Sequence, residues 1–275
     1  MLENDFLSFR QDLRYLQWDR VRQSSGTAGS FLKSYEIVNG KKIYYKLSAY
    51  DPIFGITGKE CFNELIVSRL LNILNVGHLD YQLIHADVSI SGTDYETFLC
   101  ASKDFKEKGD RKITLEDEYA LEKTENESLL SFLERMGWIT YIYQMIVVDF
   151  LIINRDRHGA NIEIVYRKSS GKKEPAPLFD HGLSLIYGCD DEKSIAGFDP
   201  MADLPVQSFF ASRSLFHNLE LIPKEKLPVF RRLDSSDKDY LFHDLYPFLS
   251  ESYIDKIWQI IFKRWSYYET LRDRQ

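Results

Sequence analysis

Residues 149–161 read Asp-Phe-Leu-Ile-Ile-Asn-Arg-Asp-Arg-His-Gly-Ala-Asn, and residues 178–182 read Leu-Phe-Asp-His-Gly. The apolar run from Trp138 to Ile153 predicts a buried helix, because it is too short to span a bilayer. A turn after this helix carries Asp156, Asn161 lies five positions later at the start of a predicted short strand, and a β-hairpin-like segment then leads to Asp180. Carboxylate and carboxamide oxygens suit Mg²⁺, and a carboxylate can orient a hydroxyl group. The spacing therefore indicates a site for phosphoryl transfer.

The order of these residues is also typical of kinases, in which an Asp, an Asn at +5 and a later Asp-x-Gly follow one another. Residues 154–161 resemble the N-x-D-R-H-x-x-N signature of the HipA-like serine/threonine kinases. The core of this signature is also similar to the catalytic loop of phosphoinositide 3- and 4-kinases, and residues 178–184 resemble the metal-binding segment of both. A polar turn would explain each residue singly, but the joint spacing favours the catalytic interpretation.

The resemblance implies a role for each matching residue. Asp156 would orient the hydroxyl acceptor, Asn161 and Asp180 would bind Mg²⁺, and Arg157 and His158 would support the loop or the ATP phosphates. Asp149 is left out of this set, because a helix-surface position is as good an explanation for it as a buried partner of the loop.

The N-terminal part supplies candidates for nucleotide binding. Lys46 lies on a predicted strand, as the phosphate-binding lysine of kinases does, and Glu64 on the next predicted helix is its expected ion-pair partner, with Glu60 as the competitor. Small residues of a glycine-containing loop would cover the phosphates: Ser24, Ser25, Gly26, Thr27 and Gly29. This loop is phosphorylated in some HipA-like kinases, which makes autophosphorylation conceivable here. The backbone of Leu99 and Ala101 would contact adenine as the hinge, and a plain edge strand is the alternative.

The predicted fold is α+β and kinase-like in two lobes, residues 1–102 being β-rich with one main helix and residues 103–275 mostly helical. Asn39-Gly40 predicts a hairpin between strands at 31–37 and 42–47. A helix over 58–74 and two strands over 81–90 and 95–101 complete the front half, and residues 5–20 show a modest helical spacing. In the rear half we expect loops at 103–125, one or two helices at 127–153, a short strand at 161–166 and helices over 215–271.

Composition limits the possible environment and partners. The 275 residues carry a net charge of −7, so no general nucleic-acid-binding surface is expected. Three widely spaced cysteines predict neither disulfides nor a zinc site, and with no secretory leader they favour a cytoplasmic protein without a membrane span. Residues 183–208 contain one lysine and five acidic residues, which would attract anionic lipids poorly.

These observations predict an ATP- and Mg²⁺-dependent phosphotransferase, with a HipA-like serine/threonine kinase or autokinase preferred. A phosphoinositide or other small-molecule kinase, a nucleotide-binding pseudokinase that acts as a scaffold, an ATPase and an AMP transferase remain alternatives. The expected partners are ATP and a protein or small-molecule hydroxyl acceptor. An antitoxin-like or regulatory protein is also possible, although the chain is much shorter than HipA toxins.

Overall fold

A computed structural model describes residues 5–20, 31–210 and 212–273. Contacts between residues divide the chain into two compact units. Unit 1 comprises Met1–Leu70 and Leu79–Phe105, and unit 2 comprises Leu71–His78 and Lys106–Gln275.

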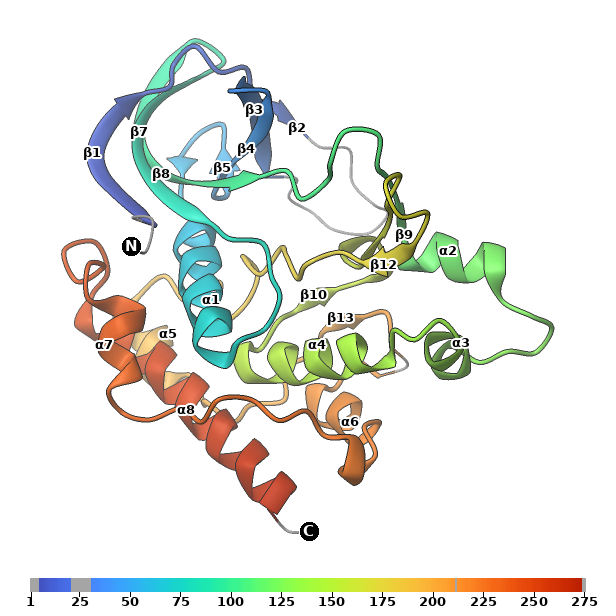
Figure 1. The fold of residues 1–275 in the computed structure, drawn as a ribbon. Coiled ribbons are helices and arrows are strands. Elements are labelled where there is room, and N and C mark those ends of the chain that lie inside the picture. The colour runs from blue at the N-terminus through green and yellow to red at the C-terminus, as the bar shows by residue number, and fades with distance from the viewer. Residues whose placement is uncertain (1–4, 21–30, 211, 274–275) are drawn as a thin grey trace. The chain divides into compact units, whose positions relative to one another are not determined.

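Unit 1 is built on a six-stranded sheet in the order β1-β7-β8-β4-β3-β2 (Figure 1). β1 runs parallel to β7, and the other neighbouring strands are antiparallel. The strands of the sheet are β1 (Phe6–Asp12), β2 (Asp19–Arg20), β3 (Leu32–Val38), β4 (Lys41–Leu47), β7 (Gln82–Ile90) and β8 (Thr93–Lys103). A small hairpin of β5 (Tyr50–Asp51) and β6 (Gly55–Ile56) precedes α1 (Glu60–Leu74).

The hairpin predicted around Asn39-Gly40 is confirmed. Both residues have a positive φ, 51° and 76°, which is the geometry that a two-residue turn between twisted strands needs. Val38 pairs with Lys41 across this turn, and the register continues to the pair of Lys33 with Lys46. The predicted succession of two strands, a helix and two strands is therefore present.

The two faces of this sheet are covered differently. On one face the ring of Phe62 in α1 lies 5.1 Å from that of Phe98, and Cys100 Sγ donates to the Cys61 carbonyl at 3.1 Å. The other face holds an apolar core in which residues before β2 pack on the strands: Leu13, Leu16, Leu32, Tyr45, Leu47, Ile84, Ala86, Val88, Ile90, Leu99 and Ala101. Strand alternation separates the two sets of side chains.

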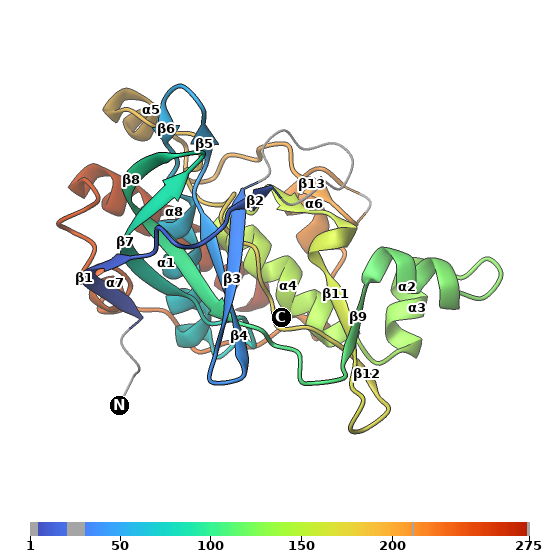
Figure 2. The same ribbon diagram turned by 90° about the horizontal axis from the view of Figure 1, so that it is seen from above.

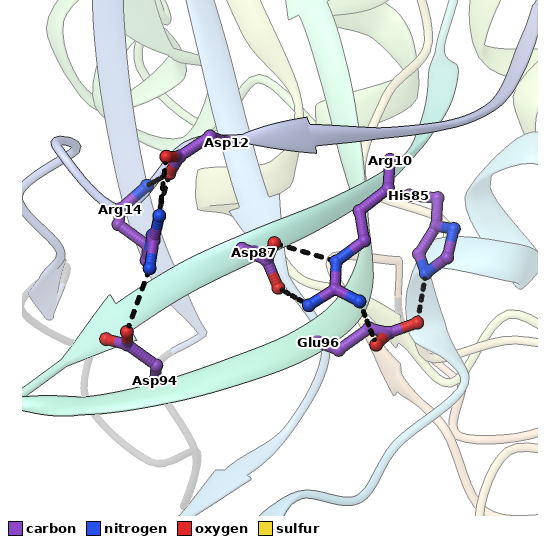
Figure 3. Close-up of polar contacts among 7 residues, drawn as sticks. All are labelled: Arg10, Asp12, Arg14, His85, Asp87, Asp94 and Glu96. Atoms are coloured by element: carbon purple, nitrogen blue, oxygen red, sulfur yellow. Dashed lines mark hydrogen bonds and ion pairs between the residues drawn. The ribbon is translucent and has the colours of Figure 1, made fainter.

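The modest helical spacing of residues 5–20 does not correspond to a helix in the structure. Residues 6–12 form β1, in which Phe6 is buried while Phe9 is 64% exposed, as expected when side chains alternate between faces. Arg10 joins β1 to the sheet through Asp87 and, at 2.6 Å, Glu96 (Figure 3). Residues 6–12 form a strand because they pair with the edge of β7, which stabilises them more than a weakly amphipathic helix would. The local sequence does not show that this edge is available.

Unit 2 is mainly helical and contains a three-stranded sheet in the order β12-β11-β9 (Figure 2). Its helices are α2 (Leu115–Glu122), α3 (Leu129–Arg135), α4 (Ile139–Ile152), α5 (Glu192–Gly197), α6 (Leu215–Glu220), α7 (Asp237–Phe242) and α8 (Glu251–Asp273), with 3-10 turns η1 (Gly159–Asn161) and η2 (Lys224–Lys226). Its strands are β9 (Arg111–Thr114), β10 (Asp156–Arg157), β11 (Glu163–Tyr166), β12 (Lys173–Pro175) and β13 (Gln207–Ser208). α4 is buried on several faces and contacts both α6 and α8.

Two expectations for this unit need adjustment, and the alternative of two helices at 127–153 is confirmed. Residues 103–125 are not simply loop, because β9 pairs with β11 and α2 is capped by Thr114. Residues 127–153 form two helices, α3 and α4, which Gly137 separates with a φ of 74°. Residues 215–271 are only partly helical, since residues 227–236 form no helix between η2 and α7.

Candidate functional site

Lys46 and Glu64 form a buried ion pair within unit 1. Lys46 Nζ donates to Glu64 Oε1 at 2.8 Å, and Glu64 is fully buried while Lys46 is 8% exposed. The competing residue, Glu60, instead accepts the Ala49 backbone N–H at 3.1 Å. The structure thus contains the pair that the sequence predicts, whereas its role in nucleotide binding stays a prediction.

The surroundings of Lys46 are apolar and aromatic. Its Nζ lies 4.7 Å from the centre of the Phe31 ring, a distance at which a cation is attracted to the ring face. Its register partner on β8 is Cys100, and burial raises the pKa of that thiol well above its ordinary value. Cys100 is therefore a neutral packing residue beside the ammonium group.

Leu99 and Ala101 do not form a hinge, so this prediction is corrected. They lie inside β8, which pairs with β7 on one side and with β4 on the other, and both side chains are buried. They belong to the apolar core on the face opposite Lys46, because Lys46 and Leu47 alternate across the sheet. The chain leaves the sheet only after Lys103. The predicted phosphate-covering residues Ser24, Ser25, Gly26, Thr27 and Gly29 lie outside the described residues.

In unit 2 the C-terminal end of α4 sets the direction in which the chain enters the loop that carries Asp156. Ile153 ends the helix with a φ of 52°, a left-handed conformation that is unusual for a β-branched residue. Asn154 then donates from Nδ2 to Asp149 at 2.8 Å and accepts the Asp156 backbone N–H at 3.2 Å. One buried side chain therefore links the helix to the backbone of Asp156.

Arg157 organises the same loop from the inside. Its side chain is 3% exposed and pairs with Asp149, at 3.0 Å from Nε and 2.9 Å from Nη2. Burial by itself would lower the pKa of Arg157, but the charge and the hydrogen bonds of Asp149, with smaller contributions from Tyr141 and Asp180, together outweigh it and the pKa is raised. Its Nη1 donates to the carbonyls of Asn161, at 3.2 Å, and Phe179, at 3.0 Å. Arg157 Nη1 thus connects the backbone of Asn161, one candidate metal ligand, with that of Phe179, the residue before Asp180, the other candidate.

Asp156, His158 and Asn161 contact one another around the tight 3-10 turn η1. Asn161 Nδ2 donates to the Asp156 carbonyl at 2.7 Å, which leaves the carboxamide oxygen as the atom suited to a cation. His158 Nδ1 accepts the Ala160 backbone N–H at 3.2 Å, so the proton of a neutral imidazole lies on Nε2. This Nε2 faces Asp156 Oδ1 at 3.5 Å. His158 Nε2 therefore lies next to the Asp156 carboxylate at a distance longer than that of an ordinary hydrogen bond.

Asp180 lies on a backbone segment that runs beside this loop. Arg155 N–H donates to the Leu183 carbonyl at 3.2 Å, and Leu185 N–H donates to the Ile152 carbonyl at 2.6 Å. Asp180 and Leu185 have φ values of 61° and 58°, and such strain in non-glycine residues is often found at functional sites. On the other side β10 pairs in parallel with β13.

Asn161 and Asp180 supply the oxygen ligands that Mg²⁺ prefers, and Mg²⁺ in phosphoryl-transfer sites commonly takes few protein ligands and several phosphate or water oxygens. In the part of the chain that the structure describes, no cluster of three or more His, Cys, Asp and Glu residues forms a metal cage.

Sequence reasoning left one important residue out. Asp149 is 5% exposed and is the carboxylate that holds both Asn154 and Arg157. The available signal was a lone charge in an otherwise apolar helix, which is costly to bury unless it has partners. Arg157 was expected only to support the loop or the phosphates, and its full burial excludes direct phosphate contact in this conformation.

Comparisons with known proteins agree with this architecture. The chain is similar to the crystal structure of a Helicobacter pylori proinflammatory kinase, CtkA, with a TM-score of 0.62 and 17% sequence identity over 96% of this chain and 97% of that one. It is also similar to HipA of Shewanella oneidensis MR-1, in a complex with HipB and operator DNA, with a TM-score of 0.46 and 17% identity over 93% of this chain and 68% of that one. Neither a protein-family model nor a curated protein sequence matches the chain.

The similarity to CtkA shows a shared fold, and it confirms the α+β kinase-like fold that the sequence predicts. Among the described residues, no helix is both long and apolar enough to cross a membrane.

Proposed function

We propose that this protein is an ATP- and Mg²⁺-dependent phosphotransferase of the HipA-like type that transfers phosphate to a serine or threonine hydroxyl. The observation that carries the proposal is the arrangement in unit 2. Arg157 ties the Asn161 carbonyl to the residue before Asp180, and Asn161 in turn bonds the Asp156 backbone. The matching signature in residues 154–161 and the kinase fold support it.

In this proposal each side chain has a defined task. Asp156 orients the acceptor hydroxyl and takes up its proton, and His158 Nε2 keeps the carboxylate in position. Lys46, held by Glu64, contacts ATP phosphates with its ammonium group. Asn161 and Asp180 would hold Mg²⁺, which supplies positive charge to the phosphates when bound.

The preference for a protein acceptor over an anionic lipid rests on surface charge. Five acidic residues of the segment 183–208 are exposed, and Lys193 is its lone lysine. Such a segment repels lipid phosphates and attracts basic protein surfaces. A panel of acceptors with radiolabelled ATP, containing a basic serine-rich protein, phosphoinositide vesicles and simple sugars, tests this preference. Labelling of the vesicles alone would contradict it.

Replacement of single carboxylates tests the proposed roles. Asp156→Asn and Asp180→Asn should each lower the kcat of phosphotransfer by about a hundredfold or more, because the first removes the hydroxyl-orienting group and the second a metal ligand. Thermal unfolding should show that both variants stay folded. Asp239→Asn makes the same charge change at an exposed position on α7 and should leave kcat unchanged. Undiminished transfer in both site variants would refute the assignment.

A further inference from the structure

Arg157 has one N–H group more than the described residues can satisfy. A guanidinium has five N–H groups. Nε uses one on Asp149, Nη1 uses two on the Asn161 and Phe179 carbonyls, and Nη2 uses one on Asp149. Among the described residues no acceptor meets the second Nη2 hydrogen, although the side chain is almost fully buried. Buried donors of this kind are normally hydrogen-bonded.

Asn218 on α6 has a buried acceptor, its Oδ1 atom, to which no described residue donates a hydrogen bond. It is 4% exposed, and its Nδ2 donates to Ser208 Oγ at 3.3 Å and to the Ser212 carbonyl at 3.1 Å. These two contacts determine the orientation of the amide, because a reversed amide would point its oxygen at the Ser212 carbonyl. Its Oδ1 is buried, and no described residue donates to it.

Arg157 and Asn218 both line one cavity of about 10 Å³ inside unit 2. Asp149, Asn154 and Ser208 add polar groups to its wall, and the remaining side chains are mostly apolar. This volume is about what a single water molecule needs, and a buried water typically makes about three hydrogen bonds. The residues that line the cavity thus include one with a spare donor, one with a spare acceptor and one with a carboxylate.

We propose that one ordered water occupies this cavity, accepts a hydrogen bond from Arg157 Nη2 and donates one to Asn218 Oδ1. Its second hydrogen can be donated to the Asp149 carboxylate. Asn218 is then a positioning residue, since it restrains the arginine whose Nη1 holds the Asn161 and Phe179 carbonyls. The position of the water does not depend on the proposed function, whereas its consequence for catalysis does.

A crystal structure of the whole chain at about 1.5 Å resolution tests the position of the water. Density for one water about 3 Å from both Arg157 Nη2 and Asn218 Oδ1 is expected. A dry cavity, or a water that contacts neither atom, would overturn the proposal whether or not the protein is a kinase.

Replacement of Asn218 tests the positioning role. Asn218→Leu removes the acceptor for the water. We expect about a tenfold increase in the Mg²⁺ concentration that gives half-maximal phosphotransfer, because loss of a residue that orients a metal ligand typically weakens metal binding by this much. Asn218→Asp keeps an acceptor for the water but turns a second oxygen towards the Ser212 carbonyl, so it should lose stability while its Mg²⁺ requirement per folded molecule stays closer to the wild type than that of Asn218→Leu. It also covers the case in which the leucine variant does not fold.

Leu219→Ala is the matched control. Leu219 is buried on the same helix but does not line the cavity, so its truncation lowers stability without touching the water. Its Mg²⁺ requirement per folded molecule should be that of the wild type. An equal change in Asn218→Leu and Leu219→Ala would show a merely structural role and refute the positioning role. A wild-type chain without any phosphotransfer would instead refute the proposed function, and the crystallographic result would still decide the water.

Discussion

At the scale of single residues, Asp149 and Arg157 determine the shape of the candidate site. Their ion pair is almost completely buried, and every further polar contact of the pair leads to the loop of residues 154–161 or to Phe179. A buried ion pair is weak evidence of net stability, because desolvation offsets the attraction. The ion pair instead fixes the position of the Arg157 guanidinium, because only one position lets it bond Asp149 and the carbonyls of Asn161 and Phe179 together.

Loss of one partner of this pair should be far more harmful than loss of both. Asp149→Leu leaves a buried guanidinium without its carboxylate and should lower the free energy of unfolding by about 3 kcal/mol. Urea titration of Asp149→Leu, Arg157→Met and the double variant measures the coupling between them. The double variant should recover part of the lost stability but no phosphotransfer. Additive losses in the double variant would contradict this account.

Gly159 is required because the loop packs closely against other segments. A Cβ at this position would lie 2.8 Å from both Glu116 Cβ and the Phe209 ring, which is too close for either to accommodate easily. Gly159→Ala should therefore cost about 1–3 kcal/mol of stability and lower activity by moving Asp156 and Asn161. In Gly197→Ala the new Cβ meets nothing within 4 Å, so this control should keep its stability or gain up to about 1 kcal/mol. Equal stability of the two variants in urea titrations would exclude the predicted clash.

At the scale of elements, α8 secures the end of α4 from which the loop departs. Arg264 on α8 is fully buried and donates to the Phe150 carbonyl at 3.0 Å, to the Pro200 carbonyl at 2.8 Å and to the Ala202 carbonyl. Its guanidinium also lies 4.9 Å from the centre of the Phe150 ring. Burial lowers the pKa of Arg264 to about 10, but the side chain remains a cation near neutral pH. A cation at the C-terminal end of α4 also complements the helix dipole.

Replacement of Arg264 tests this bracing between elements. Arg264→Met should lower the free energy of unfolding by about 3 kcal/mol, because three carbonyl groups lose their donor. Arg264→Lys should recover only part of this loss, since an ammonium lacks the planar fork of the guanidinium. Lys263→Met, at an exposed position one residue earlier, should change stability by less than about 0.5 kcal/mol. A loss in Arg264→Met no larger than in this control, measured by urea titration, would contradict the bracing role.

At the scale of the whole molecule, the stability of the folded protein at low pH depends on Asp110, whose hydrogen bonds join two strands of the small sheet in unit 2. Asp110 accepts from Arg167 at 2.8 Å and from the Lys168 backbone N–H at 3.0 Å, which joins the start of β9 to the end of β11. Arg167 and the backbone N–H groups of Lys168 and Glu107 lower the pKa of Asp110 from 3.8 to about 2. Because the folded-state pKa is depressed, this stabilisation is complete above the ordinary pKa and is lost as the pH falls through about 2.

Asp110→Asn should therefore lose stability at pH 6 and lose progressively less as the pH falls from 4 towards 2. Urea titrations of the wild type and the variant across this range give the difference in unfolding free energy. The same substitution at exposed Asp239 should give a small difference that does not depend on pH in this way. A difference for Asp110→Asn that is constant from pH 6 to pH 2.5 would contradict the predicted role of this carboxylate.

The sequence by itself determined the features that rest on local pattern and spacing. Asn39-Gly40 has the residue types that a turn with positive φ requires, and the apolar run before residue 154 favours a buried helix. The order of Asp156, Asn161 and Asp180 gives the prediction of phosphoryl transfer. Pairing between distant segments was decided by the tertiary structure alone. It made residues 6–12 a strand on the edge of β7, placed Leu99 and Ala101 on the face opposite Lys46, and brought Asp149, Arg157 and Asn218 to one cavity. These outcomes depend on register and on burial, which local sequence does not encode.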